Sequence, residues 1–475
     1  MRRRFALSGT LGPRGRARWA GASGGRTRDS GYGMLAAAMV WIQLGYMVLT
    51  VHHTPARAAL VALAPSPMTR LIKLALLLLG VVVVGSRSLV ARRVLAVLNR
   101  PLLAFMALAG ASLAWSIDPP VTAARLVALA SMGMVCLAFG VSAWRPQRFQ
   151  AVLRPAITLI LLASLLAGLL DPTLVKEVGD TISLKDAWRG LTSQKNVFGE
   201  LSSFGVIFWL HAGLARQVHW TRGLAGVALA AICLVLSRSS TSLFCTAFAV
   251  LFLLILMRPG PAVRRYLPYI VLVFTAACVG YSLAVLNVVP GLERLLIDPL
   301  VALTGKNLTF SGRTEIWQLI RENIARHPYL GSGFGAYWGA GPVPSSPSYV
   351  FVQRMWGFWP TEAHNGYYDM RNDLGIAGLL CLFGYLLAYL RQCLQLLRTD
   401  RAQAVLFLAL LFQQLLINLT ESTWLDLDNF SFTVMTAATV MLARALLEQA
   451  AVRRRSGTAA AVRRPAVRGV RRLGA

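Results

Sequence analysis

The sequence predicts an all-α protein that crosses a membrane about twelve times. Three observations support this prediction: 56% of the 475 residues are apolar, only 14% are charged, and the apolar residues gather in long runs. Soluble globular proteins carry about 25% charged residues, and a bilayer core of about 30 Å needs roughly 20 mostly apolar helical residues. The formal charge of +29 alone suggests a nucleic-acid-binding protein. Because apolar runs separate the basic residues, we expect a membrane protein that binds no nucleic acid.

Twelve apolar runs are candidates for transmembrane helices. The second run is the weakest, because Lys73 interrupts it, although a lysine can reach the interface by snorkelling. In chain order the runs cover residues 34–51, 68–85, 101–115, 121–144, 151–170, 197–215, 220–236, 241–257, 266–289, 374–390, 402–419 and 430–447.

The basic residues predict the orientation of these helices. When Lys and Arg are assigned to alternating sides of the membrane, 32 fall on the side of the N-terminus and 16 on the other. Seven of the 16 lie in one long loop, to which the positive-inside rule does not apply, so the fair comparison is 32 against 9. Both termini are therefore expected on the cytoplasmic side.

Two basic tails and two outer loops complete the expected organisation. Residues 1–33 and 448–475 are expected to be disordered cytoplasmic segments, which either attract anionic membrane lipids or simply fix the topology. Spans one to nine occupy residues 34–289, and spans ten to twelve occupy residues 374–447. The outer loops are residues 171–196 and 290–373, and loops of this length are usually functional. The longer loop has balanced charges, which predicts a partly helical cap on the membrane.

The longer loop contains a helix with a cation at its start. Its apolar positions have the spacing of one helix face: Ile316, Leu319, Ile320 and Ile324. Ser311 and Gly312 are suited to cap this helix, so Arg313 falls in its first turn. The helix dipole opposes a cation there unless an anion is also bound, in which case free N–H groups and the guanidinium can hold phosphate oxygens. Alternatively, Glu315 simply offsets the charge of Arg313.

Both outer loops contain further candidates. His364 lies between Glu362 and Asp369, and histidine is the side chain best suited to proton transfer near neutral pH. Without further context, a loop histidine more often has a structural or incidental role. Arg189 and Lys195 are six residues apart, which suits either a clamp on a lipid diphosphate or anchoring at the membrane interface.

Two other patterns point away from cofactors. The string Gly331-Ser332-Gly333-Phe334-Gly335 lacks the preceding strand of a dinucleotide site, so we expect it to let the backbone pass close to a sugar or a helix. Asp426-Leu427-Asp428 has the form of a DxD metal site, but together with Glu421 it is expected to form an acidic turn before the last span.

Three strings together resemble the O-antigen ligase and Wzy-type polysaccharide polymerase superfamily, which includes exopolysaccharide polymerases. They are WRGLTSQKN before a span, SGRTEIW at the start of the cap helix, and EAHNGYYDMRNDLGIAGLL leading into the next span. The resemblance implies a membrane fold of the glycosyltransferase C type and an inverting transferase that needs no metal or other cofactor. It implies transfer of a glycan from undecaprenyl diphosphate to an acceptor hydroxyl at the periplasmic face of the bacterial inner membrane.

The resemblance also implies roles for individual residues. Arg189 and Arg313 would bind the diphosphate, and His364 would be the general base for the acceptor or its positioner. Residues implied with less specificity in diphosphate or sugar binding are Lys195, Asn196, Asn365, Glu362 and Asp369. Aromatic side chains suited either to a sugar platform or to interfacial anchoring are Trp338, Tyr349, Trp356 and Trp359.

The acceptor distinguishes the branches of this superfamily. Ligases use the lipid A core as acceptor, whereas polymerases use a second lipid-linked glycan. The strings around Arg189 and His364 favour a polymerase of exopolysaccharide or O-antigen. A transporter or lipid-linked glycan flippase is the alternative from another class, although no six-plus-six repeat is visible and ionisable residues within the spans are few.

Overall fold

The computed structural model describes residues 23–49, 67–142, 148–177, 186–257, 313–339, 361–426 and 430–462, together with short pieces between 265 and 295. Within these ranges the chain forms helices and no extended strand, apart from one isolated β-bridge between Lys176 and Trp188. The prediction of an all-α polytopic membrane protein is confirmed.

The helices follow the predicted apolar runs closely. In the first half they are α1 (Ser23–Leu49), α3 (Pro67–Ser86), α4 (Ser88–Val97), α5 (Arg100–Ala111), the 3-10 helix η2 (Ser112–Ala114), α6 (Pro119–Ser142), α7 (Arg148–Leu170), α8 (Pro172–Val175), α9 (Lys195–Leu214) and α10 (Trp220–Leu236). In the second half they are α11 (Ser240–Met257), α15 (Arg313–Arg326), α16 (Ala336–Gly339), α18 (Gly366–Leu397), α19 (Arg401–Ile417) and α20 (Phe430–Val462).

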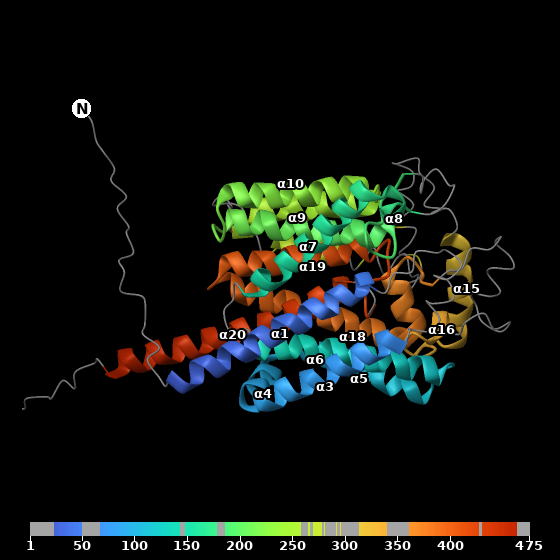
Figure 1. The fold of residues 1–475 in the computed structure, drawn as a ribbon. Coiled ribbons are helices and arrows are strands. Elements are labelled where there is room, and N and C mark those ends of the chain that lie inside the picture. Colours follow the sequence, from blue (N-terminus) through green and yellow to red (C-terminus); the bar gives the residue numbers. More distant parts are fainter. Residues whose placement is uncertain are drawn as a thin grey trace, which may run out of the picture.

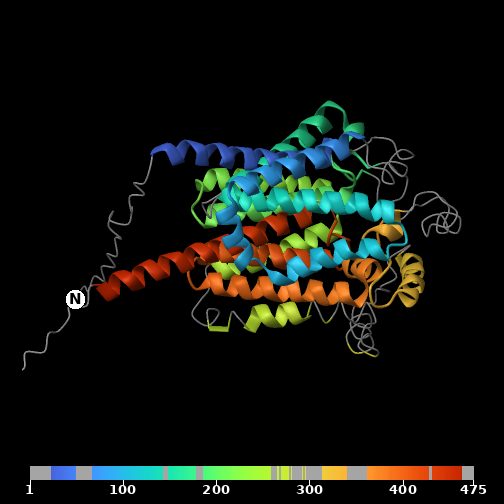
Figure 2. The same ribbon diagram turned by 90° about the horizontal axis from the view of Figure 1, so that it is seen from below.

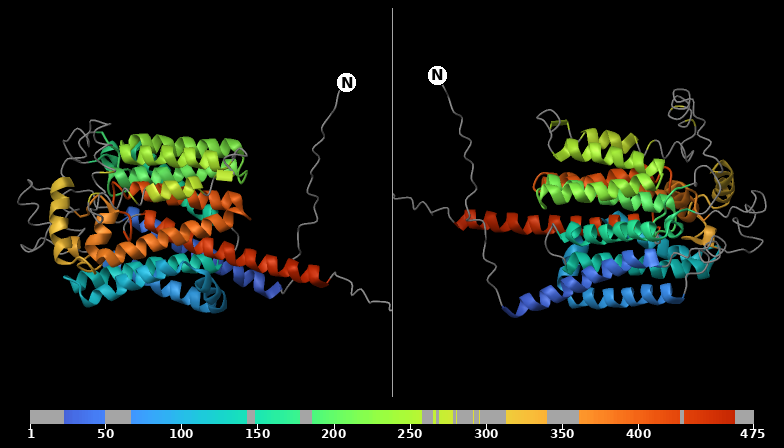
Figure 3. Two further views of the ribbon diagram at one scale, coloured as in Figure 1. Left: turned by 180° about the vertical axis from the view of Figure 1, so that it is seen from behind. Right: turned by 45° about the horizontal axis from the view of Figure 1, so that its top comes forward.

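The long helices lie side by side in one bundle (Figure 1). The short helices α8 and α16 and the cap helix α15 lie at one end of it, whereas the start of α1 and the end of α20 lie at the opposite end (Figures 1 and 2). Figure 3 shows the same separation from behind and from an oblique angle. The two described chain ends therefore share one face, which agrees with an even number of membrane crossings.

Seven described helices are long and apolar enough to cross a membrane. They are α3, α6, α7, α9, α11, α18 and the part of α20 up to Arg453. The pair α4 and α5 with η2, bent by 101°, adds an eighth if it is counted as one span, and α10 and α19 are shorter apolar helices. The ninth predicted run is described only in part, with residues 269–277 helical. The number twelve thus stays a prediction.

The second run, which Lys73 interrupts, forms a continuous helix of 20 residues, α3. The ammonium of Lys73 lies 5.4 Å from the centre of the Tyr46 ring on α1. A cation over an aromatic face gains electrostatic stabilisation, more so when it is removed from water. This contact offsets part of the cost of a lysine in an apolar helix.

The two predicted tails begin differently in the structure. Helix α1 already begins at Ser23, within the segment 1–33 expected to be disordered, and α20 continues through residues 448–462 of the expected C-terminal tail. Extending an existing helix adds one hydrogen bond per residue without a new nucleation step. The Ala- and Arg-rich sequence after Glu448 consists largely of strong helix formers.

A break in α18 determines the shape of the outer end of the bundle. Gly375 has φ 63° and ψ −158°, values that are not helical. The loop after α15 fills the break: the amides of Ile376 and Ala377 donate to the carbonyls of Pro328 and Tyr329, both at 3.1 Å. On the other side of the break, Ser332 N donates to Asn372 O at 3.0 Å and Gly333 N to Asp373 O at 2.9 Å. The loop thus satisfies the backbone groups that the helix break frees.

This break explains the glycine string. Gly331 has φ +69°, and a Cβ atom there would lie 2.3 Å from the backbone carbon of Asp373. The expectation that this string lets the backbone pass close to a helix agrees with the structure, and the helix is α18.

We predict that Gly375→Ala lowers the thermal stability of the purified protein. A Cβ atom at this position would lie 2.3 Å from the backbone carbon of Tyr329, and this φ and ψ region costs a non-glycine residue about 1–3 kcal/mol. Gly110→Ala is the matched control, because Gly110 lies in helix α5 with no neighbouring atom within 4 Å of its Cβ position. Thermal unfolding in detergent measures both variants, and an unchanged midpoint for Gly375→Ala would contradict the role of the break.

Candidate functional site

The cap helix α15 packs against the start of α18. Ile316, Ile320 and Ile324 are buried, which confirms the predicted apolar face. The Trp317 ring stacks on Tyr368 with 5.2 Å between ring centres. The helix begins at Arg313 as predicted. The side chain of Arg313 and residues Ser311 and Gly312 lie outside the described part of the structure, as do Tyr349, Trp356 and Trp359.

The segment 361–365 is held from several sides. The Trp317 indole donates to Ala363 O at 2.9 Å, and Ala363 N donates to Asp369 Oδ2 at 2.9 Å. Trp338 Nε1 donates to the other oxygen of Asp369 at 2.7 Å. Asp369, a predicted site residue, therefore fixes the loop that carries His364.

Asn365 starts α18. Its side-chain oxygen accepts hydrogen bonds from the amides of Tyr367 and Tyr368, both at 3.1 Å, as a helix N-cap does. The backbone N–H of Asn365 donates to Ser422 Oγ at 3.1 Å, and this hydrogen bond joins Asn365 to the turn before α20. Both contacts make Asn365 a scaffold residue of the site.

His364 lies between two carboxylates. Its Nδ1 atom is 3.1 Å from Glu362 Oε1 and 3.4 Å from Glu421 Oε2. Its φ of 50° falls in the left-handed region, which is uncommon for a residue other than glycine. Burial alone would lower the pKa of His364, but the charges and hydrogen bonds of Glu362 and Glu421 outweigh it and raise that pKa to about 10.

Glu421 joins the two outer loops. Its Oε1 atom accepts a hydrogen bond from Asn196 Nδ2 at 2.8 Å, while Oε2 faces His364. Asn196 is thus brought to the same site as His364, although 168 positions separate them in the sequence. Glu421 itself was expected only to belong to an acidic turn.

The cations of the shorter loop surround another carboxylate. Lys195 N, at the start of α9, donates to Glu177 Oε2 at 2.8 Å. Burial raises the pKa of Glu177, and the nearby charges of Arg189 and Lys195 partly counter this shift. The Arg189 side chain is itself buried. Arg189 and Lys195 therefore lie together beside Glu177, next to the Asn196 contact.

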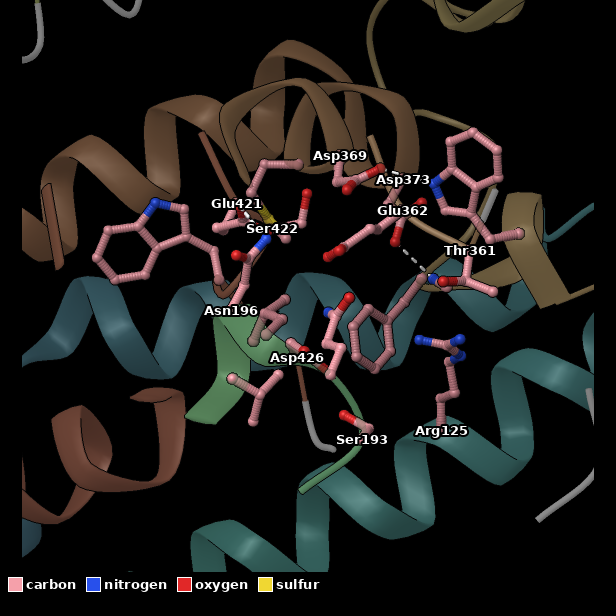
Figure 4. A pocket seen from close by; sticks show the side chains of 18 of the residues that line it. Arg125, Ser193, Asn196, Thr361, Glu362, Asp369, Asp373, Glu421, Ser422 and Asp426 are labelled. Atoms are coloured by element: carbon pink, nitrogen blue, oxygen red, sulfur yellow. Dashed lines mark hydrogen bonds between the residues drawn. The ribbon is translucent and has the colours of Figure 1, made fainter. Parts of the chain in front are cut away.

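A cavity of about 270 Å³ opens where these segments meet (Figure 4). Its wall comes from α6, from the segment 193–200, from residues 334–338, from the 361–373 segment and from the turn 421–426. Arg125 on α6 and Asn196 on α9 lie on two sides of it, with Glu362, Asp369 and Asp373 between them (Figure 4). Arg189, Lys195 and His364 are not among the lining residues, and His364 lies behind Glu362 and Glu421.

Several lining residues were not predicted as site residues. Arg125 and Glu200 had one available signal, since both are ionisable residues within apolar runs. Asp373 and Glu421 had none, because their places depend on contacts between distant segments. Asp426 lines the cavity, whereas Asp428 of the same motif lies outside the described residues.

One group of side chains in the described ranges has the arrangement to hold a metal ion. The nearest ligand atoms of Glu362, His364 and Glu421 all lie within 4.8 Å of one another. The same three groups also form a hydrogen-bonded set without an ion, since Nδ1 of His364 is within reach of both carboxylates.

Part of the chain is similar to known proteins. Residues 225–383 match the O-antigen ligase family, a stretch that contains the cap helix, His364 and the break in α18. The chain is also 32% identical over 230 residues to the exopolysaccharide production protein ExoQ of Rhizobium meliloti (strain 1021), which covers 45% of this chain and 48% of that protein. The chain thus spans about half the length of this curated relative. These matches support the resemblance seen in the sequence, and the chain is similar to members of the O-antigen ligase and polysaccharide polymerase superfamily.

Proposed function

We propose that this protein is an inverting glycosyltransferase that moves a glycan from undecaprenyl diphosphate to an acceptor hydroxyl. The observation that carries the proposal is the contact of His364 with Glu362 and Glu421 beside a cavity at the outer end of a membrane bundle. The family match supports the reaction class. The similarity to an exopolysaccharide production protein favours polymerisation, with a second lipid-linked glycan as acceptor, over ligation to the lipid A core.

In the proposed reaction, the acceptor oxygen bonds to the anomeric carbon of the donor sugar. The bond from that carbon to the diphosphate oxygen breaks, and undecaprenyl diphosphate leaves with the electron pair. The acceptor proton passes to the Glu362 carboxylate, which lines the cavity. His364 lies behind this carboxylate and is protonated at neutral pH because its pKa is raised, so it acts as the positioner of Glu362.

The leaving diphosphate needs positive charge. We assign this role to Arg313 at the first turn of α15, where free N–H groups of the helix also favour an anion, and to Arg189 with Lys195 as neighbour. Fixed cations in a partly dry site can stabilise developing charge strongly without a metal ion. The proposed orientation places this end of the bundle in the periplasm and both termini in the cytoplasm of a bacterium.

Our first functional prediction concerns His364 and Arg313. In vesicles supplied with a synthetic undecaprenyl diphosphate glycan, wild-type protein should release undecaprenyl diphosphate as the glycan lengthens. His364→Ala removes the positioner of Glu362 and should lower the rate by about 10²-fold, the scale for a catalytic group misplaced by about 1 Å. Arg313→Ala should abolish transfer. Arg321→Ala is the matched control, because Arg321 is exposed on the same helix as Arg313. Movement of the glycan lipid across the bilayer without bond cleavage would instead indicate a flippase.

The second prediction concerns the pH dependence of the site. Glu362→Gln removes the larger of the two attractions that raise the pKa of His364, so that pKa should fall from about 10 towards the ordinary value of 6.5. Protein labelled with ¹³C in histidine measures this shift by NMR, with the His364 signal assigned by its loss in His364→Asn. Asp186→Asn is the control, since Asp186 pairs with Lys176 and not with His364. An unchanged titration of His364 in Glu362→Gln would contradict the geometry.

The raised pKa of His364 also determines how the stability of the fold changes with pH. Because the pKa is higher in the folded than in the unfolded chain, the contacts of His364 stabilise the fold fully below about pH 6.5 and are lost as the pH rises through about 10.

The third prediction separates charge stabilisation by arginine from metal catalysis. If the reaction is metal-independent, transfer by protein purified and assayed in excess EDTA should proceed at the untreated rate. Loss of activity in EDTA, with recovery on adding a divalent cation, would instead assign a metal to Glu362, His364 and Glu421.

A further inference from the structure

The cavity beside His364 is strongly acidic. Six carboxyl side chains line it: Glu200, Glu362, Asp369, Asp373, Glu421 and Asp426. Arg125 is the one Lys or Arg side chain among its described lining residues. Even with His364 protonated behind the wall, the formal balance of ionised groups is negative. A diphosphate would meet repulsion from these carboxylates, so this cavity is unsuited to the charged part of the donor.

Two buried polar atoms in the lining residues lack a partner within the described part of the chain. Asp373 is 7% exposed, and its Oδ2 accepts from Gly335 N at 2.7 Å while Oδ1 has no donor. Trp424 is 3% exposed, and its Nε1 has no acceptor. Buried polar atoms in folded proteins nearly always have a hydrogen-bond partner. Both residues therefore belong to a closely packed polar wall beside the cavity.

A sugar hydroxyl donates one hydrogen bond and accepts others, so it suits the carboxylate, amide and hydroxyl groups that line this cavity. Phe334, Trp338 and Trp424 add aromatic surface to the cavity wall, which suits the apolar face of a sugar ring. The volume of about 270 Å³ is slightly below the roughly 300–1,000 Å³ of pockets for drug-sized ligands, so the ligand is small.

We infer that this cavity binds the terminal sugar of the acceptor through its hydroxyl groups and selects an uncharged sugar over one that carries a carboxylate. The inference rests on the proposed glycan transfer, in which Glu362 receives the proton of the acceptor. It adds a property of the substrate: the acceptor end is a neutral sugar, and the anionic diphosphate of the donor binds outside this cavity.

Direct binding tests this inference without any donor. The probes are methyl α-D-glucopyranoside and methyl α-D-glucopyranosiduronate, which differ by a single carboxylate on the same ring. Saturation-transfer NMR on the full chain in lipid nanodiscs should show the neutral glycoside bound, with the uronate at least tenfold weaker. Ser193→Trp places a large side chain at an exposed position on the cavity rim and should abolish binding of the neutral probe.

Charge variants identify the source of the selectivity. Asp373→Asn keeps an oxygen for the Gly335 amide but removes a charge, and Asp426→Asn does the same at a less buried position, so one variant remains informative if the other misfolds. Each should reduce the preference for the neutral probe, whereas Asp186→Asn, at a surface ion pair outside the cavity, should leave it unchanged.

Three outcomes would overturn the inference. The first is equal or tighter binding of the uronate. The second is a preference of the wild type for the uronate that is lost in Arg125→Gln. The third is no binding of either probe at tens of millimolar. Since no donor is present, each outcome is distinct from a failure of glycan transfer in the reconstituted assay.

Discussion

The outer end of this protein depends on the carboxylate of Glu421. One of its oxygens holds Asn196 at the start of α9, and the other faces His364 before α18. The backbone of the same turn also receives the amide of Gly366. A single side chain thus connects three segments that are far apart in the sequence. A buried carboxylate is costly unless such partners compensate it, so the three segments and the charge stabilise one another.

The second constraint is the broken helix α18. Asp369 and Asp373 lie one turn apart just before the break, and a continuous helix would leave no backbone groups free there for another segment. The break at Gly375 instead admits residues 328–335, and Gly335 N binds Asp373 directly. The acidic wall of the cavity is therefore built from a helix and the loop inserted into it, and small residues at positive φ make this close approach possible.

The sequence allowed the helices to be predicted because hydropathy is a local property, and α15 could be predicted from its spacing of isoleucines. The glycine string could be interpreted as a place of close backbone approach, because the lack of side chains is also a local property of the sequence. The pairing of His364 with Glu362 was within reach, since two positions separate them. The contacts of Glu421 with Asn196 and His364, and the place of Arg125 opposite Asp373, could not be predicted, because they depend on how α6, α9 and α18 pack. Glu177 was also missed, although its carboxylate interacts with both cations that the sequence singled out.

The long last helix offers a site for a rigid fusion to another protein. Helix α20 leaves the bundle at the end away from the cavity and continues to Val462 (Figures 1 and 2). Because a helix rises about 1.5 Å per residue in a fixed direction, a soluble helical domain joined in register to this segment would be carried at a defined distance and rotation. Such a rigid fusion would supply the bulk outside the membrane that particle alignment in electron microscopy needs, and it would leave the outer end of the protein untouched.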